Sequence, residues 1–190
     1  MTGRFALVLE AIDAANAADP ERALDGAAEQ PAALLYGRRM SAELVRFSPD
    51  ASEHLRIAVR GQHIERWKTP RASYPQGREG YLRWRTDLAR FHAERVAGIM
   101  REAGYGEDDC ARVMRIIRKQ GLKRDPEVQT LEDVAALVFM RWHFADFAAG
   151  RDPGQVHDIV AKTARKMSAK GREAARALGL PAGLAPALEV

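Results

Sequence analysis

Apolar residues recur three and four positions apart along most of this chain, the spacing that gathers them on one face of an α-helix. Phe5, Val8, Leu9 and Ile12 form the first such run. The period-two alternation typical of a half-buried strand does not recur. The pattern predicts about seven helices: one from Phe5 that ends at Asp19-Pro20, one that opens at Pro31, 52–67, 81–103, a shorter one that ends at Gly121, and two that begin at Asp125-Pro126 and Asp152-Pro153.

Proline and glycine mark the boundaries of these helices. Asp125-Pro126 and Asp152-Pro153 each place a capping carboxylate before a proline at the first helical position. The helix that follows Asp125 continues to Ala148 and is apolar nearly all round over 134–139, as a central helix is. Two prolines and two glycines within 68–80 indicate an ordered loop.

No domain linker or internal repeat interrupts this pattern. The tail after Gly179 contains Pro181 and Pro186 and is expected to fray. We therefore predict an all-α fold, a compact single-domain bundle over residues 1–180, with 181–190 as a frayed C-terminal tail.

Composition agrees with a globular domain. The 190 residues are 46% hydrophobic, enough for one sizeable core. The longest apolar run, 134–140, is far short of a membrane span of about 20 residues. The N-terminus lacks the features of a signal peptide, and Cys110 is the single cysteine, so no internal disulfide can form. Together these features predict a soluble, cytoplasmic protein.

Positive charge is concentrated in one segment. The formal net charge is +4, but residues 56–90 carry nine basic against three acidic residues, so the rest of the chain is slightly acidic. Such a local excess favours an anionic partner. Within this segment, six cations (Arg66, Lys68, Arg71, Arg78, Arg83 and Arg85) alternate with four aromatic residues (Trp67, Tyr74, Tyr81 and Trp84). Arginine beside aromatic rings suits phosphate and base recognition, although a solvated surface pinned by its aromatics is the alternative.

A few polar residues lie on faces that are otherwise apolar. His92 follows Leu88 at helical spacing, and Glu132 and Asp133 lie on the predicted central helix. Gln62 lies in line with apolar residues before it, with His63 beside it. A buried carboxylate needs a cation, hydrogen-bond donors or a metal. Singly, each residue fits a core hydrogen bond or a helix-dipole contact. Together, two imidazoles and two carboxylates suit a divalent ion such as zinc, manganese or iron.

Several runs resemble a family called domain of unknown function 4202. They are Gln62-His63-Ile64-Glu65-Arg66-Trp67, Pro70-Arg71, Tyr74-Pro75-Gln76-Gly77-Arg78, Gly80-Tyr81-Leu82-Arg83-Trp84-Arg85, Phe91-His92-Ala93, Asp125-Pro126-Glu127, Leu131-Glu132-Asp133 and Phe144-Ala145-Asp146-Phe147-Ala148. Members are sometimes labelled glutamyl-tRNA synthetase. Lys166-Met167-Ser168-Ala169-Lys170 looks like a class I synthetase signature, but the α/β catalytic domain and second signature of those enzymes are not visible, so we reject that label.

The order of elements is also distantly similar to the HD superfamily of metal-dependent phosphohydrolases, whose metal site lies inside an HD-like helical bundle. That resemblance places Gln62 and His63 at the His-Asp pair, His92 at a histidine of the next long helix, and Asp133 with Glu132 at the late metal-binding position. Tyr36 falls near the first histidine of the superfamily. Tyr36 and Gln62 are poor metal ligands, so this chain departs from the pattern at two positions.

These observations leave three functions open. The first is a divalent-metal-dependent hydrolase of a phosphate-bearing small molecule or nucleotide, with the metal on His63, His92 and Glu132 or Asp133. The second is a non-catalytic binding or regulatory module for an anionic ligand. RNA binding comes third, because the net charge is low and the cations cluster in one loop. The residues expected to bind the substrate are Tyr36, Gln62, Arg66, Lys68, Arg71, Tyr74, Arg78 and Arg85.

Overall fold

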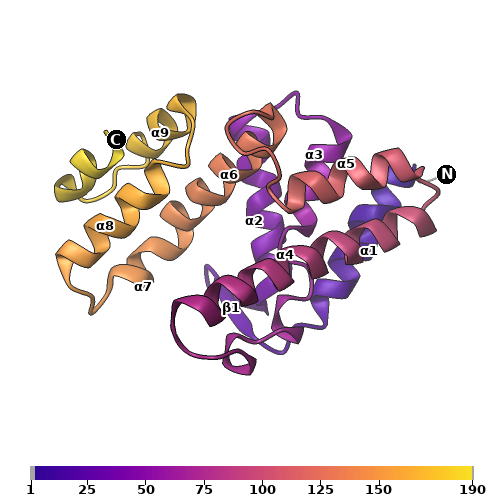
Figure 1. Ribbon diagram of the computed structural model, residues 1–190, viewed down its shortest axis with the longest axis horizontal. Helices are drawn as coiled ribbons and strands as arrows, with labels where there is room; N and C mark the ends of the chain where they lie inside the picture. Colours follow the sequence, from indigo (N-terminus) through magenta and orange to yellow (C-terminus); the bar gives the residue numbers. More distant parts are fainter. Residues whose placement is uncertain (1–2, 190) are drawn as a thin grey trace.

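The structure, a computed structural model, describes residues 3–189 and is mostly helical (Figure 1). Within this range the helices are α1 (Arg4–Ala17), α2 (Ala32–Phe47), α3 (Glu53–Gly61), α4 (Gly77–Glu102), α5 (Glu107–Ile117), α6 (Pro126–Val138), α7 (Phe144–Ala148), α8 (Pro153–Ala164) and α9 (Ala169–Arg176). Shorter turns are η1 (Arg66–Lys68), η2 (Arg71–Ser73), the π-helical η3 (Phe139–His143) and η4 (Ala182–Leu188). The two strands are β1 (Arg22–Asp25) and β2 (Ala28–Pro31).

The molecule is elongated, with α1 and the C-terminal helices at opposite ends (Figure 1). Helices α1 to α5 form one bundle, and the helical run from α6 through α7 leads from it to α8 and α9. Within the described residues, no helix combines the length and apolarity that crossing a membrane requires.

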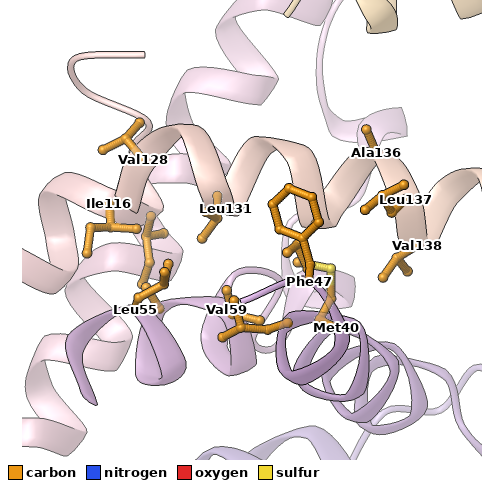
Figure 2. Packing of buried hydrophobic residues seen from close by; sticks show 14 of the residues in the cluster. Met40, Phe47, Leu55, Val59, Ile116, Val128, Leu131, Ala136, Leu137 and Val138 are labelled. Atoms are coloured by element: carbon orange, nitrogen blue, oxygen red, sulfur yellow. The ribbon is translucent and has the colours of Figure 1, made fainter. Parts of the chain in front are cut away.

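Helix α6 forms one side of the main core. Its apolar residues face side chains from α2, α3 and α5 (Figure 2). Leu131 of α6 and Met40 of α2 are both fully buried. Truncating a fully buried side chain of this size to alanine costs about 2–5 kcal/mol, so we expect both residues to be important for stability. The labelled members of the cluster are Met40, Phe47, Leu55, Val59, Ile116, Val128, Leu131, Ala136, Leu137 and Val138.

The two predicted Asp-Pro helix starts are confirmed. The Asp125 carboxylate accepts hydrogen bonds from the backbone N–H groups of Glu127 and Val128 at 3.1 and 3.4 Å. The Asp152 carboxylate accepts from the Gln155 N–H at 3.0 Å. Each cap satisfies donors that the first helical turn leaves without partners.

The predicted helix over 52–67 ends early. Helix α3 stops at Gly61, where a Cβ would collide with Val96 of α4. The chain then turns through Glu65, a non-glycine residue at φ 51°, before η1. The helix ends here because α3 and α4 pack closely at Gly61. The spacing of apolar residues along the chain does not indicate such a contact.

A β-hairpin between α1 and α2 was not predicted. Its strands pair antiparallel, with Asp25 opposite Ala28 and Gly26 at φ +64° in the turn. Leu24 is the largest apolar residue of β1 and is 62% exposed, so the hairpin has no buried face to generate an alternating pattern.

The C-terminal end also differs from the expected frayed tail. Ser168 caps α9, and η4 follows with Leu184 and Leu188 buried against the rest of the core. Pro181 precedes this short packed turn, and Pro186 lies inside it. The predicted helix through Ala148 is a continuous helical run, although Phe139–His143 adopts the wider π-helical form.

Candidate functional site

Four aromatic rings from four segments form a row beside the α3 terminus. Tyr36 of α2 stacks on His63 with ring centroids 4.4 Å apart and planes 16° apart. His92 of α4 lies 5.8 Å from His63, and His143 of the π-helical turn lies 6.1 Å from Tyr36. We call His143, Tyr36, His63 and His92 the four-ring row. The early end of α3 brings His63 into this row.

His92 has one nitrogen engaged and one without a partner. Its Nδ1 donates to the backbone carbonyl of Ile64 at 2.7 Å. A carbonyl only accepts, so the proton is on Nδ1 and Nε2 keeps its lone pair. That Nε2 is buried with no partner among the described residues. Burial lowers the pKa of His92 to about 4, so the ring is neutral at neutral pH.

His63 and Tyr36 are uncharged for related reasons. Burial, followed by the positive charge of Arg66, holds the pKa of His63 well below its usual range. Burial raises the pKa of Tyr36 despite the opposing charge of Arg66, so its phenol stays protonated. The row is therefore neutral at physiological pH.

The adjacent acids of α6 point in different directions, because consecutive helical residues are about 100° apart around the axis. The buried Asp133 carboxylate accepts from the Ser168 backbone N–H at 2.8 Å and from the Ser168 hydroxyl at 2.6 Å. It also accepts from the side-chain amide of Gln129 at 3.1 Å. Asp133 therefore holds the start of α9 and does not join the histidines.

Glu132 faces the other way and forms an ion pair with Lys119. Burial alone would raise the pKa of Glu132, but Lys119, Lys166 and Arg85 outweigh it and hold that pKa below its ordinary value. Its negative charge also contributes to the raised pKa of Tyr36, after burial.

These positions bear directly on the predicted metal ion. No group of three His, Cys, Asp or Glu side chains in the described part of the chain is placed to hold an ion. His63 and His92 supply two imidazoles, while Glu132 and Asp133 are engaged elsewhere. A catalytic zinc ion keeps three protein ligands, of which the described residues bring together two imidazoles, and the metal ion stays a prediction.

A large pocket opens beside His63 and His92, with a volume of about 1190 Å³. Its lining contains no Asp or Glu among the described residues. We call it the basic pocket, because eight of its lining residues are cationic: Arg66, Arg78, Arg85, Arg118, Lys119, Lys162, Arg165 and Lys166.

Most of these cations lack a carboxylate partner. Lys119 is paired with Glu132, whereas the other seven form no ion pair with any residue that the structure describes. Some cations outside the pocket are paired with acids; Arg112, for example, binds both Asp125 and Glu127. The side chains that line the basic pocket therefore carry a net positive charge, which favours an anionic ligand.

Arg66 stands between this pocket and a second one. Its guanidinium lies over the Trp84 ring, 4.8 Å from the centroid, and it lines both pockets. It is partly buried and forms no ion pair with a described residue, and burial lowers its pKa. A desolvated cation without a counter-charge is costly unless a ligand supplies one.

The second pocket has a volume of about 550 Å³ and a different lining. We call it the aromatic pocket, because Tyr36, Trp67, Trp84 and Phe139 line it together with His63 and His143. Its acidic members come from the base of the hairpin. The Asp19 carboxylate already accepts from the N–H groups of Glu21 and Ala33, at 2.9 and 2.8 Å, so it serves to hold α2.

The predicted substrate-binding residues divide into three groups. Gln62, Arg66, Arg78 and Arg85 line the basic pocket. Tyr36 and Arg71 line the aromatic pocket, although Arg71 also donates to two loop carbonyls. Lys68 and Tyr74 line neither: Lys68 pairs with Glu65, and the Tyr74 hydroxyl donates to Asp87 at 3.1 Å.

Sequence reasoning missed five of the eight cations that line the basic pocket. Lys162, Arg165 and Lys166 are spaced three and four apart at the end of α8, and this basic stripe was a usable signal. Arg118 and Lys119 follow the apolar part of α5 and gave no comparable pattern. His143 was not among the predicted site residues, but it lines the aromatic pocket.

This geometry defines a class of protein: it is mostly helical and has two adjoining pockets, one basic and one aromatic. The chain matches the model of the family described as "Domain of unknown function (DUF4202)" over residues 6–187. It belongs to that family, as its motifs predicted. No curated protein and no solved structure matches the chain.

Proposed function

We propose that this protein binds a phosphate-bearing small molecule in the basic pocket, as a binding or regulatory module. The observation that carries this proposal is Arg66, a partly buried guanidinium without a carboxylate partner among the described residues, in a pocket whose lining has eight cations and no acid. Arginine forks bind phosphate oxygens through paired, charge-assisted hydrogen bonds.

The cations approach the pocket from three directions. Arg78 and Arg85 lie on α4, Arg118 and Lys119 follow α5, and the stripe from Lys162 to Lys166 ends α8. Convergence from separate elements suits a compact anion surrounded on several sides. Nucleic acid favours an extended basic face and a larger net charge than +4.

Calorimetric titration with pyrophosphate tests the proposal. We expect saturable binding and a higher melting temperature, because a ligand that binds only the folded state stabilises it. Arg66→Met keeps the stem over Trp84 but removes the charge, and should weaken binding about tenfold or more. Arg83→Ala is the matched control, since Arg83 is exposed on α4 but lies outside the pocket lining.

Two results would overturn the proposal. One is the absence of pyrophosphate binding by the intact protein. The other is an equal loss of pyrophosphate affinity in Arg66→Met and Arg83→Ala, since a general effect of net charge would weaken binding in both variants alike. Tighter binding of long RNA than of pyrophosphate, with a steep salt dependence, would favour the nucleic-acid alternative.

Hydrolysis of the bound phosphate compound, in the manner of an HD-like enzyme, is the second candidate. The observation that favours it is the buried Nε2 lone pair of His92, beside the neutral ring of His63 and at the edge of the basic pocket. Phosphate release from nucleotides, measured with and without added zinc, manganese or iron, tests it. Turnover that is lost in His92→Gln would replace the binding-module proposal with this one.

A further inference from the structure

The two pockets are not separate. His63, Arg66 and Trp84 line both of them, so a ligand in the basic pocket borders the aromatic pocket across a wall of three side chains. The basic pocket offers charge, whereas the aromatic pocket offers flat apolar surfaces. A single ligand that fills both must carry a phosphate at one end and a planar apolar group at the other.

The aromatic pocket is held in shape by contacts within the protein. The Trp84 indole N–H donates to the Thr69 carbonyl at 2.9 Å, which orients its ring. On the opposite side, Phe139 packs edge-on against Phe144 and Phe147 at 6.2 and 5.3 Å. Its volume of about 550 Å³ falls within the usual range for small-molecule sites, roughly 300–1,000 Å³.

One polar atom of a residue that lines this pocket lacks a partner. The His143 Nε2 is buried and forms no hydrogen bond with any described residue. Burial, followed by the charge of Arg39, lowers the pKa of His143, so its ring is neutral at neutral pH and Nε2 has one hydrogen bond to offer. His143 and Phe139 bound the π-helical turn and both line the pocket; such turns recur at functional sites.

Resting on the proposed function, we infer that the ligand is a nucleoside phosphate. Its phosphate lies among the cations of the basic pocket, and its base lies in the aromatic pocket against Trp67 and Trp84, with one polar edge bonded to His143. A planar heterocycle can stack on the aromatic rings, and its polar edge atoms can bond to the His143 Nε2. A sugar phosphate without a base offers neither interaction.

The test compares nucleoside monophosphates with ribose 5-phosphate, which shares the phosphate and sugar but lacks the base. Pyrophosphate reports on the basic pocket alone. We expect at least one nucleoside monophosphate to bind about tenfold tighter than ribose 5-phosphate, because stacking a base on aromatic side chains contributes roughly 1–3 kcal/mol. Trp67→Ala and His143→Phe should each remove most of that gain while leaving pyrophosphate affinity unchanged.

Trp142→Phe is the control, since Trp142 is an aromatic residue of the same π-helical turn that lines neither pocket. Melting curves confirm that each variant folds. If pyrophosphate binds but every nucleoside monophosphate binds no tighter than ribose 5-phosphate, the inference is wrong and the proposed function stands. If a nucleoside monophosphate binds tighter than ribose 5-phosphate but keeps that advantage in both Trp67→Ala and His143→Phe, the assignment of the base to the aromatic pocket is wrong. If pyrophosphate does not bind, the proposed function itself fails.

Discussion

The Lys119 ammonium forms an ion pair with the Glu132 carboxylate, linking the turn after α5 to helix α6. Their side chains are 24% and 12% exposed, so both charges are largely shielded from water. Glu132 was predicted to bind a metal or a counter-charge, and the structure supplies a counter-charge from within the chain.

Removing one partner of this pair should destabilise the protein. Lys119→Met leaves Glu132 partly buried without its cation, and we expect a loss of about 1–3 kcal/mol in the free energy of unfolding at pH 7. Adding Glu132→Gln should recover part of that loss, because the uncompensated charge disappears. Urea denaturation of the single and double variants measures this coupling; strictly additive losses would contradict it.

Zinc affinity should be weak in the wild type and should stay weak in Lys119→Met. The Glu132 carboxylate is paired with Lys119, and among the described residues no three His, Cys, Asp or Glu side chains are placed to hold an ion. Elemental analysis of untagged protein, together with zinc titration of both forms, checks this. Stoichiometric metal in the wild type as purified would instead support the ion predicted from sequence.

Asp133 is expected to matter for stability and not for ligand binding. Asp133→Ala removes the acceptor for both donors of Ser168, and should lower the free energy of unfolding by about 3 kcal/mol. Gly171→Ala should act in the same direction, since its Cβ would lie 2.6 Å from an Asp133 carboxylate oxygen. Below the melting transition, pyrophosphate affinity should be unchanged in both variants; a selective loss of affinity would give Asp133 a direct role.

Substitution of two arginines of the basic segment 56–90 should have opposite effects on stability and on ligand binding. Arg71 donates to the carbonyls of Tyr74 and Gly77 at 3.0 and 3.4 Å, so Arg71→Ala should lower the melting temperature. Arg78 is exposed, lines the basic pocket and has no ion-pair partner among the described residues, so Arg78→Ala should weaken pyrophosphate binding about tenfold with little change in melting temperature. The sequence alone led us to expect the ligand effect from both. Reversal of the two phenotypes would contradict the assigned roles.

Stability should fall as the pH is lowered through the range in which the histidines titrate. Burial lowers the pKa of His92 to about 4, whereas an unfolded histidine titrates near 6.5. Between these values the unfolded chain binds more protons, so stability is full above about pH 6.5 and is lost as pH falls toward 4. The contribution is at most about 1.4 kcal/mol per pH unit.

His92→Gln should flatten that slope. Glutamine can still donate to the Ile64 carbonyl but does not titrate. Denaturation curves for both proteins at pH 7, 6, 5 and 4 measure the difference. Because burial also lowers the pKa of His63 and of His143, a residual slope should remain in His92→Gln and should become shallower in the double variant with His63→Gln. Identical slopes in wild type and double variant would show that these rings are not responsible.

The sequence by itself determined most of the helices and the identity of the central helix, because these depend on local spacing and caps. Asp125 and Asp152 mark the starts of their helices by bonds to N–H groups within three residues, and the apolar run over 134–139 has no exposed residue. It also pointed to His63 and His92 and to three of the eight cations of the basic pocket, since a polar residue in an apolar stripe is visible without coordinates. His92 is 2% exposed, as its stripe predicted.

Tertiary structure decided which of these residues meet. Glu132 and Asp133 are neighbours in sequence and alike in chemistry, yet one pairs with Lys119 and the other with Ser168, because the helix axis separates their directions by about 100°. The α8 cations come to Arg66 from about a hundred positions away along the chain. Contacts between residues so far apart in the sequence depend on how the helices pack across the core. The periodic pattern within one helix does not indicate which other helix packs against it.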